Sequence, residues 1–77
     1  DLSSARPTRP GQFYPFYVNL ETHSIEAIGE ALAPEVPREK APQRPGCVAV
    51  FPVRPDGTEL NWGITAEPAR KRLEAAT

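Results

Sequence analysis

The chain has 77 residues, with 9 lysine and arginine residues against 10 acidic ones, a formal net charge of −1 and a single cysteine. This length allows one domain with a core near the lower limit for independent stability, and the charge balance excludes a strong overall field for nucleic acid or acidic lipid. The single cysteine excludes an internal disulfide, and no cluster of residues has metal-ligand spacing.

Neither a membrane span nor a secretory leader is predicted, because no apolar run reaches about 20 residues and no charged-then-apolar start is present. The chain has no methionine and begins at Asp1, from which we expect a segment of a longer polypeptide. The cysteine usage fits a reducing compartment, so we expect a cytoplasmic protein. Ten prolines are roughly double the average usage of about 5% and predict stiff connecting segments.

Residues 1–12 are polar and rich in proline and glycine without any periodicity, so we expect them to form a linker. Arg6 and Arg9 are candidates there for phosphate contact. Two arginines on an exposed tail are usually solvated, however, and we expect that of both. Residues 13–77 are expected to form a single small α+β domain.

Residues 13–20 predict the first strand, because Phe16, Val18 and Leu20 alternate onto one face. Pro15 has no N–H to donate to a neighbouring strand. We therefore expect this strand either to lie at a sheet edge or to pair regularly only from Phe16 onward.

A tight turn at residues 21–23 is predicted to lead into a second strand at residues 24–28. His23 falls where a left-handed backbone is convenient, and histidine tolerates that conformation better than most residues other than glycine. The alternative is a catalytic base or a pH switch. No nucleophile or metal ligand lies nearby in the sequence, so the turn is the favoured role.

Residues 29–46 combine several prolines with mixed charges, which precludes a stable helix. We expect a long connector with polyproline II character that crosses from the first hairpin to the second. The alternative is a proline-rich ligand for an aromatic groove on a partner. The connector is the favoured interpretation.

Residues 47–64 predict a second hairpin, the most strongly patterned part of the chain. Its turn suits type I geometry, because Pro55 presets φ at the second position and Gly57 supplies a positive φ. The expected register pairs Arg54 with Thr58.

This register determines the two faces of the second hairpin. Phe51 and Val53 fall on one face, and they are too apolar to face water, so we expect a neighbour or partner to cover them. These two residues are the candidates for an interaction surface. The opposite face is expected to be the core, and it contains two cross-strand pairs, Val50 with Trp62 and Val48 with Ile64.

A C-terminal helix is predicted to begin after Thr65, which is suited to cap it, and Pro68 is tolerated in its first turn. The basic run Arg70, Lys71 and Arg72 is a candidate for contact with nucleic-acid phosphate. A solvated helix face is the ordinary alternative and is favoured from the run alone. The expected fold is therefore α+β, with two antiparallel hairpins in one small sheet and this helix packed on it.

No catalytic constellation is found: the chain has no glycine-rich phosphate loop, no paired carboxylates at a useful spacing and no Ser/His/Asp set. Cys47 starts an apolar strand and is expected to be a small buried residue rather than a reactive thiol. Trp62 is in phase with Leu60 and Ile64, which favours a core role over stacking on a nucleic-acid base.

Three motifs follow one another in the chain: YPFYVN at 14–19, Glu-Thr at 21–22 and VAVFPVRPDGTELNW at 48–62. This series resembles a segment of site-specific DNA methyltransferases of the type III restriction–modification kind, which modify the amino group of adenine or cytosine. In that family a strand such as YPFYVD, a Glu-Thr-Gly turn and a P-x-R/D-x-D-G-x-E-x-x-W hairpin recur in this order. The resemblance covers residues 13–73, with His23 at the usual turn glycine, and the hairpin pattern is matched by Pro52, Arg54, Asp56, Gly57, Glu59 and Trp62.

The chain also departs from the family pattern. Asn61 and Gly63 stand beside Trp62 where the family often has arginines, which weakens a phosphate contact there. The catalytic D/N-P-P-Y/F loop and the F-x-G-type S-adenosylmethionine site of the family are both missing from this chain. The resemblance therefore implies a non-catalytic accessory domain, with no cofactor of its own, in a parent enzyme that uses S-adenosylmethionine.

Such a domain is expected to help position DNA or the catalytic domain, so duplex DNA and the rest of the parent methyltransferase are the expected partners. The alternative is a structural or protein-interaction module without nucleic-acid contact, which docks through Phe51 and Val53. The residues expected to contact DNA are Arg54, Arg70, Lys71 and Arg72.

Overall fold

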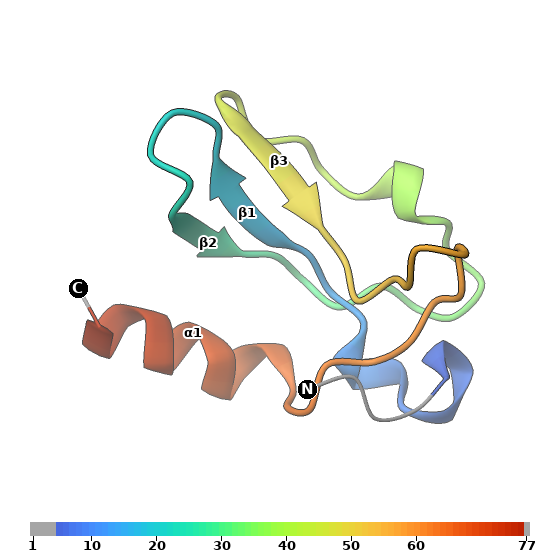
Figure 1. Ribbon diagram of the computed structural model, residues 1–77. Helices are drawn as coiled ribbons and strands as arrows, with labels where there is room; N and C mark the ends of the chain where they lie inside the picture. The colour runs from blue at the N-terminus through green and yellow to red at the C-terminus, as the bar shows by residue number, and fades with distance from the viewer. Residues whose placement is uncertain (1–4, 77) are drawn as a thin grey trace.

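The computed structural model describes residues 5–76 and contains a three-stranded antiparallel sheet followed by one C-terminal helix, which confirms the predicted α+β fold. Figure 1 shows α1 beside β2, with β3 at the far side of the sheet. Three short 3₁₀ helices lie at Arg6–Thr8, Pro10–Gln12 and Arg38–Lys40. The regular elements are β1 (Phe16–Asn19), β2 (Ile25–Ile28), β3 (Cys47–Val50) and α1 (Ala66–Ala76), and the strand order is β2-β1-β3.

The first hairpin forms where the sequence predicts it. β1 pairs with β2, and His23 in the turn between them has φ 61°, in the left-handed region. The side chain of Asn19 holds this turn, because its Oδ1 accepts hydrogen bonds from the amides of Glu21 at 2.8 Å and Thr22 at 2.9 Å. A bulge between Tyr17 and Val18 shifts the register and bends this side of the sheet.

The predicted second hairpin is only partly correct. Its turn forms, since the Arg54 amide donates to the Thr58 carbonyl at 2.9 Å and Gly57 has φ 93°. The Leu60 amide also donates to the Pro52 carbonyl at 2.8 Å, but Pro52 has no N–H to return. The ladder therefore stops, and Leu60 bridges instead to Ala5.

β3 pairs with β1 rather than with residues 58–64. Val50 lies opposite Phe16 and Val48 opposite Val18, so the expected pairs of Val50 with Trp62 and Val48 with Ile64 are wrong. β1 offers β3 four consecutive partners, which the interrupted hairpin cannot match. The amide of Trp62 donates to the Gln12 carbonyl at 2.9 Å, which joins this segment to the N-terminal part of the chain.

Residues 5–12 pack onto the domain, contrary to the expected linker with a solvated Arg6. The Arg6 amide donates to the Glu59 carbonyl at 3.1 Å, and Arg6 is only 5% exposed. Arg9 is exposed, as expected. Residues 1–4, the rest of the predicted linker, lie outside the described residues.

The core lies between α1 and one face of the sheet. Its fully packed members are Tyr14 and Ile28 from the sheet side and Ala66 and Ala69 from α1. Phe16, Trp62, Ile64 and Leu73 pack around them and are partly buried. Because the apolar stripe of α1 is narrow and lies beside β2, it leaves much of this face uncovered.

Candidate functional site

The uncovered part of the sheet face is the first candidate for function. β1 presents Phe16 to the helix side, and the pairing places Val48 and Val50 on the same face. Val48 is 45% exposed and Val50 38%, so the expectation that they form the core is wrong. Ile25 of β2 is also 40% exposed. An apolar strip therefore continues from the core to open solvent along β3.

Two adjoining hollows lie where this face meets α1, and together we name them the α1 groove. Their volumes are about 410 Å³ and about 210 Å³, and they share Phe16, Ile64 and Arg72 as lining residues. The first is also lined by Tyr14, Trp62 and Gly63, and the second by Ile25, Ile28, Ala69 and Leu73.

Aromatic side chains form a fixed wall of the α1 groove. The ring of Trp62 stacks on Phe16 with centroids 4.5 Å apart and planes within 9°. Trp62 Nε1 donates to the Tyr14 carbonyl at 2.7 Å, and the Tyr14 hydroxyl donates to the Ile64 carbonyl at 2.9 Å. Burial raises the pKa of Tyr14, and the positive charge of Arg70 partly opposes this rise. The hydroxyl therefore keeps the proton that it donates.

Of the three basic residues predicted as DNA contacts on α1, Arg70 is engaged within the domain. Its Nε donates to the Ile28 carbonyl and its Nη2 to the Gly29 carbonyl, both at 3.0 Å, while Nη1 pairs with Glu67 at 2.9 Å. These contacts cover the outer end of β2, a position where unpaired backbone groups would otherwise face solvent. Arg70 thus contributes to the fold and has little capacity left for a phosphate.

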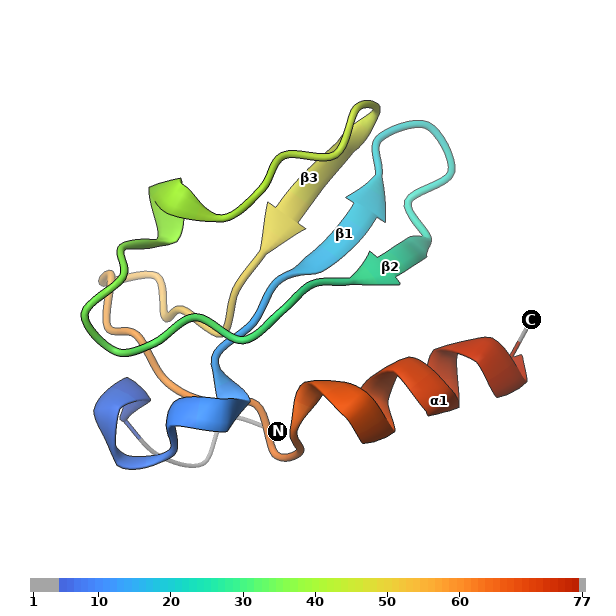
Figure 2. The same ribbon diagram turned by 180° about the vertical axis from the view of Figure 1, so that it is seen from behind.

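Lys71 and Arg72 are exposed, and neither takes part in the ion pairs found among residues 5–76. Arg72 lines both hollows of the α1 groove, whereas Lys71 lines neither. Arg54 is exposed at the turn of residues 54–57, which Figures 1 and 2 place on the other side of the molecule from the middle of α1. The four predicted DNA contacts therefore do not form one basic patch.

Of Phe51 and Val53, the predicted interaction surface, Phe51 packs on a ring of the same domain and Val53 is partly buried. Phe51 stacks on Phe13 with centroids 5.1 Å apart, and Val53 forms an isolated bridge with Glu59. The guanidinium of Arg6 covers the other side of the Phe13 ring at 4.0 Å from its centroid. The neighbour that covers Phe51 is thus Phe13 of the same chain.

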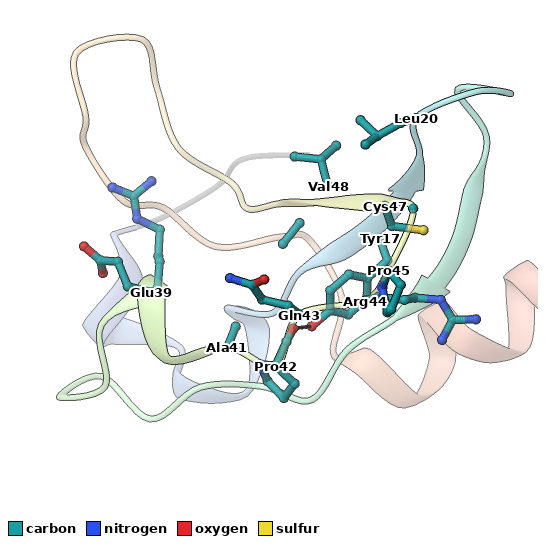
Figure 3. A pocket seen from close by; sticks show the side chains of 13 residues that line it. Tyr17, Leu20, Glu39, Ala41, Pro42, Gln43, Arg44, Pro45, Cys47 and Val48 are labelled. Carbon is teal, nitrogen blue, oxygen red and sulfur yellow. Dashed lines mark hydrogen bonds between the residues drawn. The ribbon is translucent and has the colours of Figure 1, made fainter.

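Another hollow of about 620 Å³ lies between the proline-rich connector and β3 (Figure 3). The Tyr17 hydroxyl donates to the Pro42 carbonyl, which ties the connector to the sheet face opposite α1. Arg38, Glu39 and Arg44 are the charged residues that line this hollow. Arg44 Nη2 lies 3.7 Å from a carboxylate oxygen of Glu26, and Arg38 Nε lies 2.7 Å from one of Glu59. Two of the three charged residues that line the hollow are therefore already paired within the domain.

Cys47 at the rim of that hollow is half-buried, and its thiol donates to Glu26 Oε2 at 3.0 Å. This hydrogen bond to a carboxylate, with the negative charge of Glu26, raises the pKa of Cys47. The same contact, with the Asn19 amide, lowers the pKa of Glu26. A thiol held in its protonated form is a weak nucleophile, which supports the expected inert role.

Among residues 5–76, no group of three histidine, cysteine or acidic side chains is arranged to hold a metal ion. In the same part of the chain, no helix is long and apolar enough to cross a membrane. His23 is exposed in its turn and lines neither hollow of the α1 groove.

Comparison with known proteins finds no matching family model, no matching curated protein and no matching solved structure. The residues that carry the resemblance to the methyltransferase segment have structural roles in this fold. Trp62 and Gly57 hold the aromatic wall and the turn, as described above. Asp56 Oδ1 accepts the Thr58 amide at 2.9 Å, which lowers the pKa of Asp56, and Glu59 pairs with Arg6 at 3.1 Å. The matched positions are scaffold positions.

Proposed function

We propose that this chain is a non-catalytic accessory domain of a DNA-modifying methyltransferase, and that it docks on another protein part of that enzyme. The methyltransferase assignment rests on the sequence resemblance. The observation that carries the docking role is the uncovered apolar face, on which Val48 and Val50 are 45% and 38% exposed beside the α1 groove. Exposed apolar residues that form a continuous patch are typical of interaction sites.

Binding to the catalytic domain of a type III-like methyltransferase, followed by calorimetry, tests this role. Val48→Lys places a charge on the apolar face and is expected to weaken binding at least about tenfold, as for an unpaired charge in an interface. Ala49→Lys is the matched control, because Ala49 is exposed on the same strand but points to the opposite face. Equal losses for both variants, or no binding by the unmodified chain, would count against docking through this face.

DNA contact is the second candidate, and the observation in its favour is that Lys71 and Arg72 are adjacent, exposed cations on α1. A gel shift with duplex DNA at several salt concentrations tests it, because phosphate contacts weaken steeply as salt rises. Loss of the shift when Lys71 and Arg72 are both changed to alanine would support this role. A shift that both substitutions leave unchanged would remove it.

The chain alone is proposed to transfer no methyl group, and S-adenosylmethionine is proposed to bind elsewhere in the parent enzyme. Methyl transfer from labelled S-adenosylmethionine to DNA by the purified chain would refute that proposal.

A further inference from the structure

We propose that the α1 groove binds an apolar protein segment that carries a carboxylate side chain, and that Arg72 recognises the carboxylate. This inference deepens the docking role proposed above, since it names the chemistry of the partner segment. It rests on the lining of the groove, on the position of one cation and on the way the groove's wall is fixed.

The lining of the α1 groove suits apolar side chains. Phe16 and Ile64 lie between its two hollows, Trp62 forms one end and Leu73 the other. The two hollows have volumes of about 410 Å³ and about 210 Å³. Taken together, they fall in the range of ordinary ligand sites, roughly 300–1,000 Å³. Two adjoining hollows match a segment that presents two apolar side chains on one side, as an amphipathic helix does.

Arg72 is the one charged residue that lines either hollow, among the residues the structure describes. Its neighbour Arg70 is occupied by two backbone carbonyls and two carboxylates, but Arg72 takes part in no such pair within residues 5–76. An ionic contact beside apolar walls is stronger than one in open water, because less solvent screens it. The planar guanidinium also accommodates a carboxylate with two parallel hydrogen bonds.

The wall of the groove is held in place before a ligand binds. This favours binding, because little conformational entropy of these side chains is lost on association. Trp62 is held by stacking on Phe16 and by its hydrogen bond of 2.7 Å to the Tyr14 carbonyl. Such a pre-formed aromatic surface is typical of the residues that contribute most to protein interfaces. A DNA backbone, by contrast, offers no apolar groups to fill hollows lined by Ile64 and Leu73.

Selection of a random peptide library displayed on phage, against the full 77-residue chain, tests the inference without the methyltransferase. The enriched peptides are expected to combine two apolar residues with Asp or Glu. Synthetic copies are expected to lose at least about tenfold in affinity for Arg72→Leu, the size of one charge-assisted contact. Lys71→Leu is the matched control, since it removes an adjacent exposed cation outside the groove, and it is expected to change affinity less than about twofold.

Charge exchange makes the test independent of any loss of folding. Arg72→Glu is expected to reject the selected peptides and to bind copies in which the acidic residue is replaced by lysine. Enrichment of no common motif or of basic peptides, equal losses for Arg72→Leu and Lys71→Leu, or displacement of the peptides by duplex DNA would overturn the inference. Failure to bind the methyltransferase catalytic domain would remove the proposed function and leave this peptide result standing.

Discussion

Replacing Arg6 by alanine is expected to destabilise the domain by about 3 kcal/mol, because two backbone carbonyls would lose the charged group that donates to them. The guanidinium donates to the Ala33 carbonyl at 2.8 Å and to the Val36 carbonyl, and it lies 3.1 Å from Glu59. Leaving a buried acceptor without its donor costs about 1–3 kcal/mol for each group. Glu59 adds little to this loss, since its side chain is 30% exposed and keeps a second partner, Arg38, at 2.7 Å.

Urea and thermal unfolding followed by circular dichroism measure this loss. A domain of this size has a free energy of unfolding of roughly 4–12 kcal/mol, and each kcal/mol lowers Tm by about 4–8 °C, so the effect is large. Arg6→Lys keeps the positive charge but lacks the planar guanidinium, so its free energy of unfolding is expected to lie between those of the unmodified chain and Arg6→Ala. Arg9→Ala is the control, because Arg9 is an exposed neighbour, and should change the free energy by less than about 0.5 kcal/mol. A loss below about 1 kcal/mol for Arg6→Ala, equal to that of Arg9→Ala, would refute the view that residues 5–12 belong to the fold.

Three further substitutions test other parts of the structure. Arg70→Ala is expected to destabilise by about 2 kcal/mol through lost charge-assisted hydrogen bonds, whereas Lys71→Ala should have almost no effect in the same urea titration. Gly57→Ala is expected to cost about 1 kcal/mol, because φ is 93° there although the added Cβ meets no atom within 4 Å; an unchanged stability would contradict the turn geometry. Glu26→Gln is expected to lower the pKa of Cys47 and so to increase its rate of alkylation by iodoacetamide at about pH 8; an unchanged rate would argue against the thiol–carboxylate contact.

Local chemistry made the first hairpin and the second turn predictable. The left-handed residue at His23 and the positive φ at Gly57 follow from the short-range preferences of those residue types, and both are present. The helix from Ala66 is equally local, since Pro68 and the alanine spacing suffice to predict it. The α+β class follows from these elements together.

Partner choice over long sequence distances was not predictable in the same way. The pattern of Val48 and Val50 is compatible with either neighbour, and pairing with β1 prevails because Pro52 interrupts the alternative ladder. Burial of Arg6 depends on carbonyl groups about 30 residues away in the connector, at Ala33 and Val36, and no local pattern indicates them.

The same limit applies to the candidate site. Arg70 and Arg72 belong to one basic run, and the sequence does not distinguish them. Because α1 packs beside β2, Arg70 donates to the Ile28 carbonyl, whereas Arg72 lines the α1 groove. Phe51 is covered by Phe13 of the same chain, a contact between residues 38 positions apart that no local pattern indicates.

The most direct test of docking through the α1 groove uses Trp62, the single tryptophan of the chain. The chain labelled with 5-fluorotryptophan gives one ¹⁹F resonance, which reports on the wall of the groove alone. We predict that the catalytic domain of a type III-like methyltransferase shifts this resonance and shields it from solvent, while duplex DNA leaves it unchanged. A resonance that DNA shifts and saturating catalytic domain does not would contradict the account.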